Sequence, residues 1–256
     1  MATAWVTGAS AGLGEGFARK LAARGHDLIL TARRADRLEA LAAELRAGGR
    51  QVHVLPADLA KPGAVDALMA EIARAGLSVN LLVNNAGFGL RGAFAELDRA
   101  KQAEMIDLNC RALVELCHAV LPGMIQMRQG GILNVASTAA FQPGPWMSVY
   151  YATKAFVLSF SEGLHEEVKA QGVRVAALCP GATRTEFGAI SDMESSRLFK
   201  MLAGEAEQVI DDGLRALDRN QAVKVSGLVN AAIAASPRFT PRWLARAIAG
   251  GLQKPG

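Results

Sequence analysis

The feature that most constrains the fold of this chain is a regular alternation between two kinds of segment. Short runs of β-branched and other apolar residues occur at Ala4–Val6, Asp27–Thr31, Val52–Leu55, Val79–Val83, Ile132–Val135, Val173–Leu178 and, more weakly, Ala222–Val225. Longer segments with apolar residues at helical spacing separate these runs. Parallel strands joined by right-handed helical crossovers are covered on both faces, and they are therefore apolar throughout. The sequence predicts an α/β fold with a doubly wound sheet of about seven parallel strands.

The length and organisation of the chain indicate a single folding unit. Its 256 residues contain no linker, no low-complexity tract and no internal repeat. A chain of this length can bury a large core, and roughly 150 residues per domain is typical. We therefore expect one domain over residues 1–256, with a basic tail that begins near residue 226.

Several features favour a cytoplasmic location. The sequence begins MATAWVTGAS, which lacks the basic segment and apolar run of a secretory signal. No stretch approaches the ~18 uninterrupted apolar residues of a membrane span. Cys110, Cys117 and Cys179 are an odd number in apolar surroundings, so we expect free thiols in a reducing compartment. The cysteines and histidines show no metal-ligand spacing, and no metal site is predicted.

A glycine-rich string, TGASAGLG, follows the first expected strand and opens a helix. Glycine allows a sharp turn and a close approach of the backbone to a pyrophosphate. The helix N-terminus then supplies free N–H groups and a favourable dipole. We expect this string to bind the phosphates of a dinucleotide through Gly8, Ser10, Gly12, Leu13 and Gly14. The alternative is an ordinary strand-to-helix turn that is rich in glycine.

The end of the second expected strand indicates which dinucleotide is bound. An acidic residue here, about 20 residues after the glycines, would hydrogen-bond the ribose 2′-hydroxyl of NAD. This chain has Ala32 at that place, followed by Arg33 and Arg34. Because guanidinium groups pair with phosphate, the sequence favours NADP(H) over NAD(H); the alternative is a pair of solvated arginines. Asp36, followed by Glu39, is explained better as the cap of the next helix.

Several short motifs then follow one another along the chain. They are Asn84-Asn85-Ala86-Gly87, Asn109, Ser137, Tyr150-x-x-x-Lys154 and Pro180-Gly181 leading to Thr185. Ser137 lies 13 residues before Tyr150, and Lys154 follows Tyr150 by one helical turn. In order and spacing, residues from 1 to about 225 resemble the short-chain dehydrogenase/reductase family. The resemblance implies a Rossmann-type fold and a nicotinamide dinucleotide as cofactor.

The Tyr150–Lys154 pair also has a physical interpretation of its own. Residues four apart share one face of a helix, and a nearby ammonium group stabilises a phenolate, which lowers the pKa of the phenol. Ser137, at the end of a strand, can donate a hydrogen bond to a substrate oxygen where charge develops. The alternative for the pair is an interface tyrosine beside a surface lysine. Tyr151 is adjacent, but its spacing from Lys154 and Ser137 does not fit.

The family resemblance assigns catalytic roles to four residues: Asn109, Ser137, Tyr150 and Lys154. It implies that Tyr150 is the acid–base group and that the Lys154 ammonium also binds the nicotinamide ribose. It further implies that Asn109 anchors a proton relay of water molecules through Lys154.

The other expected cofactor contacts lie at the ends of later strands. Asp58 and Leu59 follow the third strand, where the resemblance implies contact with adenine; a turn or helix-cap aspartate is the alternative for Asp58. The small residues after the fourth strand are expected beside the adenosine ribose, and they are Asn85, Ala86 and Gly87. A plain turn is the alternative. After the sixth strand the expected contacts are Pro180, Gly181, Thr183 and Thr185. The resemblance implies that Thr185 holds the nicotinamide carboxamide for transfer of the pro-S hydride.

Substrates of doubly wound folds bind beyond the carboxyl ends of the strands. Candidate pocket residues there are Phe88, Leu90, Phe141, Gln142, Trp146, Ala182 and Phe187, and residues from about 186 to 201 are expected to form a lid. This composition favours an apolar site for a ketone or secondary alcohol of modest size. Arg184 is expected to be exposed; contact with an acidic group of substrate or cofactor is the alternative.

Two features bear on partners. The helices expected near 109–127 and 150–171 each carry a second apolar face, formed by Leu113, Leu116 and Val120 and by Phe156, Phe160 and Leu164. The resemblance implies that such faces pair in a homodimer or homotetramer. From Arg219 onward the chain has six basic and no acidic residues, so the net charge of +4 belongs to the tail and no nucleic-acid partner is indicated. We expect the tail to pack on the fold with a solvated basic edge; contact with an anionic membrane surface is the alternative.

These features together predict an NADP(H)-dependent oxidoreductase that interconverts a carbonyl group and a secondary alcohol on a small molecule. A protein of another class, a dinucleotide-binding sensor or scaffold without turnover, would not need the set of Ser137, Tyr150 and Lys154. A sugar-nucleotide epimerase or dehydratase is less favoured, because little chain remains after Val225 for its substrate domain.

Overall fold

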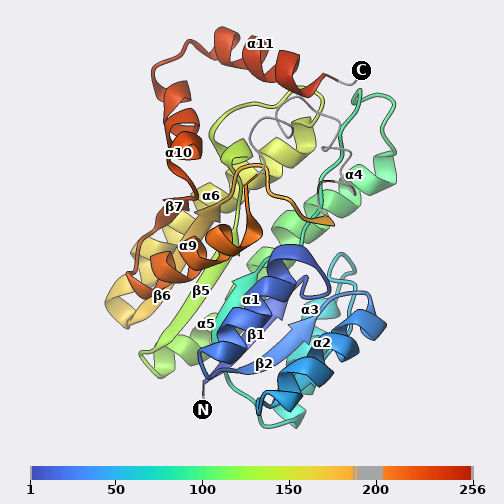
Figure 1. The fold of residues 1–256 in the computed structure, drawn as a ribbon, viewed down its shortest axis with the longest axis vertical. Coiled ribbons are helices and arrows are strands. Elements are labelled where there is room, and N and C mark those ends of the chain that lie inside the picture. Colours follow the sequence, from blue (N-terminus) through green and yellow to red (C-terminus); the bar gives the residue numbers. More distant parts are fainter. Residues whose placement is uncertain (1, 187, 189–203, 255–256) are drawn as a thin grey trace.

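The computed structural model describes residues 2–186, 188 and 204–254. Its centre is a seven-stranded sheet with the order β3-β2-β1-β4-β5-β6-β7 (Figure 1), and all neighbouring strands are parallel. The strands are β1 (Thr3–Thr7), β2 (Asp27–Thr31), β3 (Val52–Val54), β4 (Val79–Asn84), β5 (Gly130–Val135), β6 (Val173–Cys179) and β7 (Val223–Val225). The predicted doubly wound α/β fold is confirmed. The strand order reverses between β1 and β4, which is where ligands bind in such folds.

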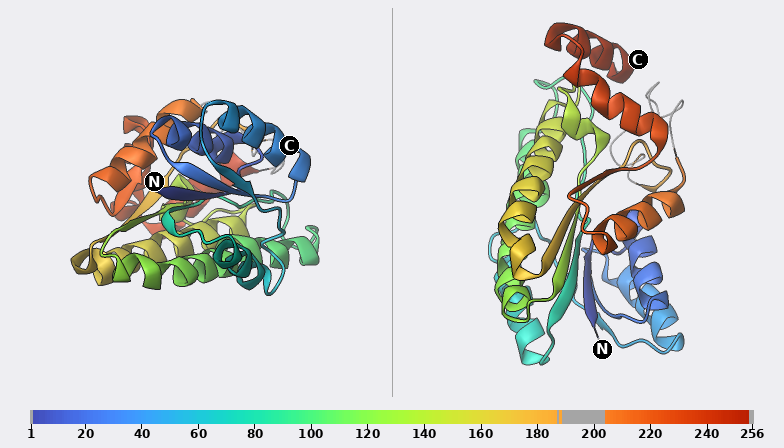
Figure 2. Two further views of the ribbon diagram at one scale, coloured as in Figure 1. Left: turned by 90° about the horizontal axis from the view of Figure 1, so that it is seen from below. Right: turned by 90° about the vertical axis from the view of Figure 1, so that its left-hand side faces the viewer.

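Helices cover both faces of the sheet (Figure 2). One face carries α1 (Gly12–Ala23), α2 (Ala35–Ala47) and α9 (Ala206–Asp218), and the other carries α3 (Ala64–Arg74), α5 (Leu113–Gln126) and α6 (Ser148–Val168). Because side chains alternate along a strand, Leu28 and Leu30 of β2 pack in the first core and Ile29 in the second. Burial on both faces explains why the strands are continuous apolar runs in the sequence.

The start of α2 differs from the prediction. Arg34, not Asp36, is the residue before the helix, and its side chain makes no capping hydrogen bond. With φ −88° and ψ 90°, Arg34 still has extended backbone, so the helix begins at Ala35. Asp36 lies in the first turn, where a carboxylate interacts favourably with the helix dipole.

The second apolar face predicted for α5 is wrong. Leu113, Leu116 and Val120 are buried in the core beneath the sheet, and Leu164 of α6 joins them there. Hydrophobic periodicity indicates that a helix has an apolar face but not which neighbour covers it. On α6, the remaining pair stays near the surface as stacked rings, with Phe156 43% exposed.

One continuous helical stretch, Arg99–Gln126, is long and apolar enough to cross a membrane by length and composition. It consists of α4 (Arg99–Ile106), a π-helical turn (Asp107–Ala112) and α5. Cys117 and Met124 of α5 are fully buried in the core against the sheet. In this fold, α5 is therefore a helix that packs on the sheet.

After β7 the chain forms α10 (Leu228–Ala235) and α11 (Arg242–Gln253), which lie beyond the carboxyl ends of the strands (Figure 1). Ala245 and Ala249 of α11 are buried, whereas its basic residues Arg242 and Arg246 are exposed. The exposed arginines agree with the expected basic edge, but Trp243 and Ile248 of the same helix are 65% and 54% exposed, so its large apolar residues do not pack on the fold as expected. The expected lid over about 186–201 lies outside the described residues, except for two positions, 186 and 188.

Candidate active site

A cleft of about 360 Å³ opens at the carboxyl ends of the strands, where the strand order reverses. The predicted residues that line it are Gly8, Ser10, Gly12, Leu13, Arg33, Arg34, Asp58, Leu59, Asn85, Ala86, Gly87, Ser137, Tyr150, Lys154, Pro180, Gly181, Thr183 and Thr185. They belong to the loops after β1 to β6, to the start of α1 and to α6. Two further predicted residues, Gly14 and Asn109, lie behind this surface rather than on it.

The glycine-rich loop is shaped to hold an anion. Gly8 and Gly12 have φ of +65° and +57°, a backbone conformation that other residues rarely adopt. A Cβ at Gly14 would lie 2.2 Å from the carbonyl oxygen of Gly8, so this glycine lets helix and loop pack closely. Ala11 precedes α1 without a capping side chain, which leaves the first N–H groups of the helix for a ligand. These features fit a dinucleotide pyrophosphate.

Thr7, which was not among the predicted site residues, connects this loop to the end of β4. Its hydroxyl oxygen accepts hydrogen bonds from the N–H groups of Asn85 and Ala86, each at 3.1 Å. Nδ2 of Asn85 donates to the Thr7 carbonyl at 3.0 Å. The two sides of the cleft are therefore held in a fixed relation.

Arg34 lies between the glycine-rich loop and the far side of the cleft. Its Nε and one terminal nitrogen each lie 3.2 Å from the hydroxyl oxygen of Ser10, and the other terminal nitrogen pairs with Glu186 at 3.0 Å. Arg37 of α2 also pairs with Glu186. Hydrogen bonds from Arg37 and Arg34 hold the pKa of the Glu186 carboxyl below its usual value. Glu186 lines the cleft but was not predicted, because the ion pairs join residues about 150 positions apart in the sequence.

Arg33 lies on the outer side of the same cleft end. Its guanidinium pairs with Glu104 of α4 at 3.2 Å, and its side chain is 61% exposed. Ala32, the first residue after β2, lines the cleft and has no carboxylate that would accept a hydrogen bond from a ribose hydroxyl. This end of the cleft therefore presents guanidinium groups where an NAD-binding site would present a carboxylate.

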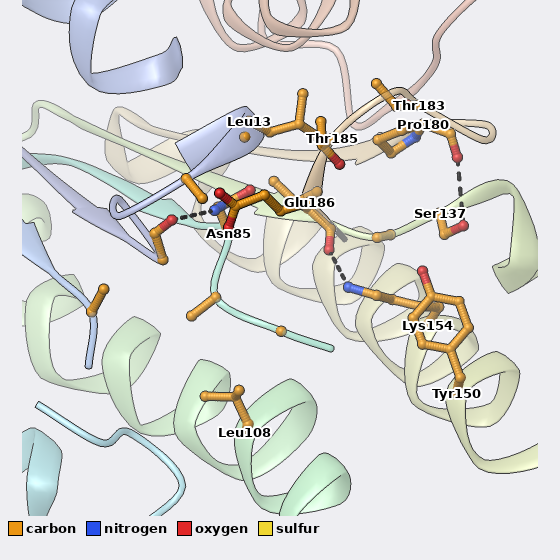
Figure 3. A pocket seen from close by; sticks show the side chains of 18 of the residues that line it. Leu13, Asn85, Leu108, Ser137, Tyr150, Lys154, Pro180, Thr183, Thr185 and Glu186 are labelled. Carbon is orange, nitrogen blue, oxygen red and sulfur yellow. Dashed lines mark hydrogen bonds between the residues drawn. The ribbon is translucent and has the colours of Figure 1, made fainter. Parts of the chain in front are cut away.

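The predicted catalytic side chains converge at the other end (Figure 3). Tyr150 and Lys154 project from α6 into the cleft; the Tyr150 hydroxyl group points to the side of Ser137, which follows β5, and Nζ of Lys154 points away from it. The Ser137 side chain interacts with the Tyr150 phenol and acts to lower its pKa. Nζ of Lys154 donates to the carbonyl of Val135 at 2.8 Å and lies 5.8 Å from the centre of the Tyr150 ring. Tyr150 and Lys154 are 5% and 6% exposed, so both ionisable groups are almost removed from water.

The electrostatic balance at Tyr150 differs from the prediction. Burial raises the pKa of the phenol, and the Ser137 side chain acts to lower it. Burial is the larger of these two effects, so the pKa of Tyr150 is raised, whereas the sequence predicted a lowering by Lys154. Burial also lowers the pKa of Lys154, to about 8, because a charged amine in this environment loses its hydration. In this structure, desolvation therefore outweighs the attraction between the two groups.

The pKa of Lys154 predicts how stability changes with pH. The ordinary lysine value is 10.5, so between pH 8 and 10.5 the unfolded chain binds more protons at this position than the folded protein. The contribution of Lys154 to the free energy of unfolding therefore rises with pH in this window. Urea unfolding of wild type and Lys154→Met at pH 7, 8.5 and 10 measures it. We expect wild type to gain on the order of 1–3 kcal/mol relative to the variant. A difference that does not change with pH would contradict the assigned pKa.

Asn109 lies behind the cleft, in the π-helical turn between α4 and α5, and is 2% exposed. Its Nδ2 donates to the Phe88 carbonyl at 3.0 Å and to the Thr153 hydroxyl at 3.1 Å, and its Oδ1 accepts from the Phe88 N–H at 3.2 Å. A Cβ at Gly87 would lie 2.9 Å from Oδ1 of Asn109 and 3.7 Å from Nζ of Lys154. Glycine at 87 thus leaves the space between these two side chains open.

The side-chain contacts of Asp58 and Arg184 bear on the two interpretations that the sequence left open for each residue. Asp58 lines the cleft. Its Oδ1 also accepts a hydrogen bond from the Ala60 N–H at 3.2 Å, so the same side chain closes a turn. Arg184 has a side chain 66% exposed and pairs with Glu205 at 2.7 Å, which agrees with the expected exposure.

The predicted substrate residues mostly lie outside the lining. Of that set Ala182 lines the cleft, and Phe187 lies outside the described residues. The others pack in hydrophobic clusters or lie half-buried nearby, namely Phe88, Leu90, Phe141, Gln142 and Trp146. Apolar residues after a strand are also needed to close the core, so their type does not identify a pocket. Tyr151, which its spacing had excluded, does line the cleft.

Known proteins share both this sequence pattern and this architecture. The family model described as short chain dehydrogenase matches residues 2–194. The chain belongs to the short-chain dehydrogenase/reductase family and is an NAD(P)-dependent oxidoreductase acting on carbonyl and alcohol groups.

Among similar proteins, sulfoacetaldehyde reductase of Chromohalobacter salexigens is 42% identical over 185 residues, 72% of this chain and 73% of that protein. The NADP-dependent 3-hydroxy acid dehydrogenase YdfG of Escherichia coli K12 is 38% identical over 205 residues, 79% of each chain. A solved short-chain dehydrogenase from Sphingobium yanoikuyae in complex with NADPH is 36% identical and covers 95% of each chain, with a TM-score of 0.83.

Proposed function

We propose that this protein is an NADP(H)-dependent oxidoreductase that interconverts a small carbonyl compound and a secondary alcohol, with Tyr150 as the acid–base group. The observation that carries the proposal is the convergence of Ser137, Tyr150 and Lys154 at one end of the cleft whose other end is a phosphate cradle. A binding protein without turnover would need the cradle but not this set of three side chains, two of which are buried.

The cofactor would lie along the whole cleft. Its pyrophosphate would be held by the glycine-rich loop and the N-terminus of α1, and its 2′-phosphate by Arg33 and Arg34. When bound, it supplies or accepts the hydride. Preference for NADP(H) is supported by these guanidinium groups, by the name of the Escherichia coli relative and by the NADPH in the Sphingobium structure.

Ser137, Tyr150 and Lys154 would act together on the substrate oxygen. Because burial raises the pKa of Tyr150, the phenol keeps its proton at neutral pH and can donate it to the oxygen of a carbonyl that is being reduced. Ser137 would donate a second hydrogen bond to the same oxygen as negative charge develops there. Lys154, when protonated, would stabilise the phenolate left behind and hold the nicotinamide ribose. Asn109 would fix the Gly87–Phe88 backbone and anchor the proton relay toward Lys154.

We extend the proposal to the organisation of the protein. One continuous sheet and its helices support a single domain over residues 1–256, with the expected lid and tail as parts of it. The buried free thiols of Cys117 and Cys179 support a reducing, cytoplasmic location. Assembly as a homodimer or homotetramer stays a prediction from the family resemblance. The predicted apolar face of α5 does not support it, because the residues of that face lie in the core.

A substrate screen tests the proposed function. Purified protein is assayed for NADPH oxidation and NADP reduction with hydroxy acids, 3-oxoacyl esters, aldehydes, steroids and polyols. We expect turnover with at least one small carbonyl compound. A protein that binds NADPH and turns over none of the panel would overturn the proposal and favour a nucleotide sensor.

A further inference from the structure

The C-terminal helix α11 reaches the catalytic cleft through a buried hydrogen bond. Nε2 of Gln253, at the end of this helix, donates to the hydroxyl oxygen of Tyr151 at 3.0 Å. Gln253 is 1% exposed and Tyr151 is 5% exposed. Tyr151 lines the cleft beside Tyr150, with ring centres 6.2 Å apart in an edge-to-face arrangement. The last helix of the chain thus contacts the wall next to the proposed acid–base group.

Two further contacts hold this bond in place. The buried guanidinium of Arg91 donates to the backbone carbonyls of Gln253 and Lys254, each at 2.7 Å, at the end of α11 where such carbonyls lack helical partners. The ring of Tyr151 packs directly on Gly144, because a Cβ at that glycine would lie 2.3 Å from the ring carbons. These contacts fix the backbone at the end of α11 and the ring of Tyr151.

The pair keeps unused hydrogen-bonding capacity. Among the described residues, Oε1 of Gln253 has no partner although it is buried. Turning the amide over would let it accept the Tyr151 proton, but Nε2 would then lack a partner. One polar atom of the amide is therefore unsatisfied in either orientation, which is rare for a buried group and is a reason to look for a ligand.

We propose that Tyr151 is a specificity-determining residue of the substrate site and that Gln253 is the positioning residue that fixes its hydroxyl group. The proposal rests on the proposed carbonyl reduction. The substrate class it implies is a carbonyl compound with an uncharged hydroxyl group a few carbons from the reacting carbon. A hydroxyl group both donates and accepts, so it can accept the proton of the Tyr151 hydroxyl group, whose oxygen already accepts from Gln253, in an otherwise apolar cluster.

The test compares matched pairs of aldehydes or ketones, with and without a hydroxyl group two to four carbons from the carbonyl. We expect wild type to prefer the hydroxylated member of at least one pair. Tyr151→Phe should raise its KM about 5- to 100-fold, with kcat and the KM of the deoxy partner little changed. Gln253→Met should act in the same direction, and the double variant should be no worse than Tyr151→Phe, since both remove one interaction.

Gln126→Met is the matched control, because Gln126 is an exposed glutamine at the end of α5. It should leave the preference unchanged. Melting temperature and NADPH affinity of each variant separate a local effect from unfolding. Equal effects on both members of every pair, or no effect, would overturn the proposal. Failure of wild type to turn over any carbonyl compound would instead remove the proposed function on which it rests.

Discussion

Tyr150→Phe is expected to lower kcat by a factor of about 10²–10⁴ while the affinity for NADPH changes little. The substitution removes one oxygen, that of the phenol whose pKa the Ser137 side chain acts to lower. It keeps the ring, which packs with Met147 and beside Gly89. Any loss of turnover therefore reports on proton transfer rather than on folding. Steady-state kinetics on the best substrate of the screen, together with fluorescence titration of NADPH, measures both quantities.

The only other tyrosine of the chain provides the comparison. Tyr151 is equally buried and lines the same cleft, but its hydroxyl oxygen accepts a hydrogen bond from Gln253. Tyr151→Phe should therefore change kcat by a far smaller factor than Tyr150→Phe. If the two variants lose kcat equally, or if Tyr150→Phe keeps wild-type turnover, the assignment of the acid–base group is wrong.

Removal of the two arginines after β2 is expected to have the second largest effect. Hydrogen bonds to charged groups contribute about 1.5–3 kcal/mol each, so Arg33→Ala and Arg34→Ala should each raise the Kd for NADPH by roughly 10- to 100-fold. The Kd for NADH should change much less, because the two cofactors differ only in the 2′-phosphate. Isothermal titration with both cofactors gives the ratio directly. Equal loss for NADPH and NADH would disprove the 2′-phosphate assignment.

Arg37→Ala is the matched control for this experiment. The substitution removes the same charge from the same region. Arg37 does not line the cleft, however, and its guanidinium pairs with Glu186. The ratio of the two dissociation constants should stay at the wild-type value. A shift as large as that of Arg34→Ala would mean that the general positive potential, and not a specific contact, selects the cofactor.

Much of the fold could be predicted because its signals are local. The predicted run Asp27–Thr31 is β2 in the structure, with the same first and last residues. A strand covered on both faces is a continuous apolar run, which is a local signal in the sequence. The glycine string was equally informative, because positive φ at Gly8 and Gly12 is a backbone property of a few successive residues. The same holds for Tyr150 and Lys154, whose common direction follows from four residues on one helix.

Other features needed the folded chain. Hydrophobic periodicity predicted that α5 has an apolar face, but it did not indicate that Leu116 and Val120 of this face pack against the sheet. The capping role predicted for Asp36 failed because Arg34 keeps an extended backbone before the helix. The pKa of Tyr150 moves opposite to the prediction, since its sign depends on burial, and burial is set by every element around the ring.

The sequence by itself therefore determined the strands, the phosphate-binding loop and the spacing of the acid–base pair, all of which depend on neighbours within a few residues. Only the tertiary structure decided the contacts between distant segments. Glu186 meets Arg34 across 152 positions, and Gln253 meets Tyr151 across 102. Such contacts leave no periodic pattern in the sequence, because their partners become neighbours only when the sheet and its helices have packed.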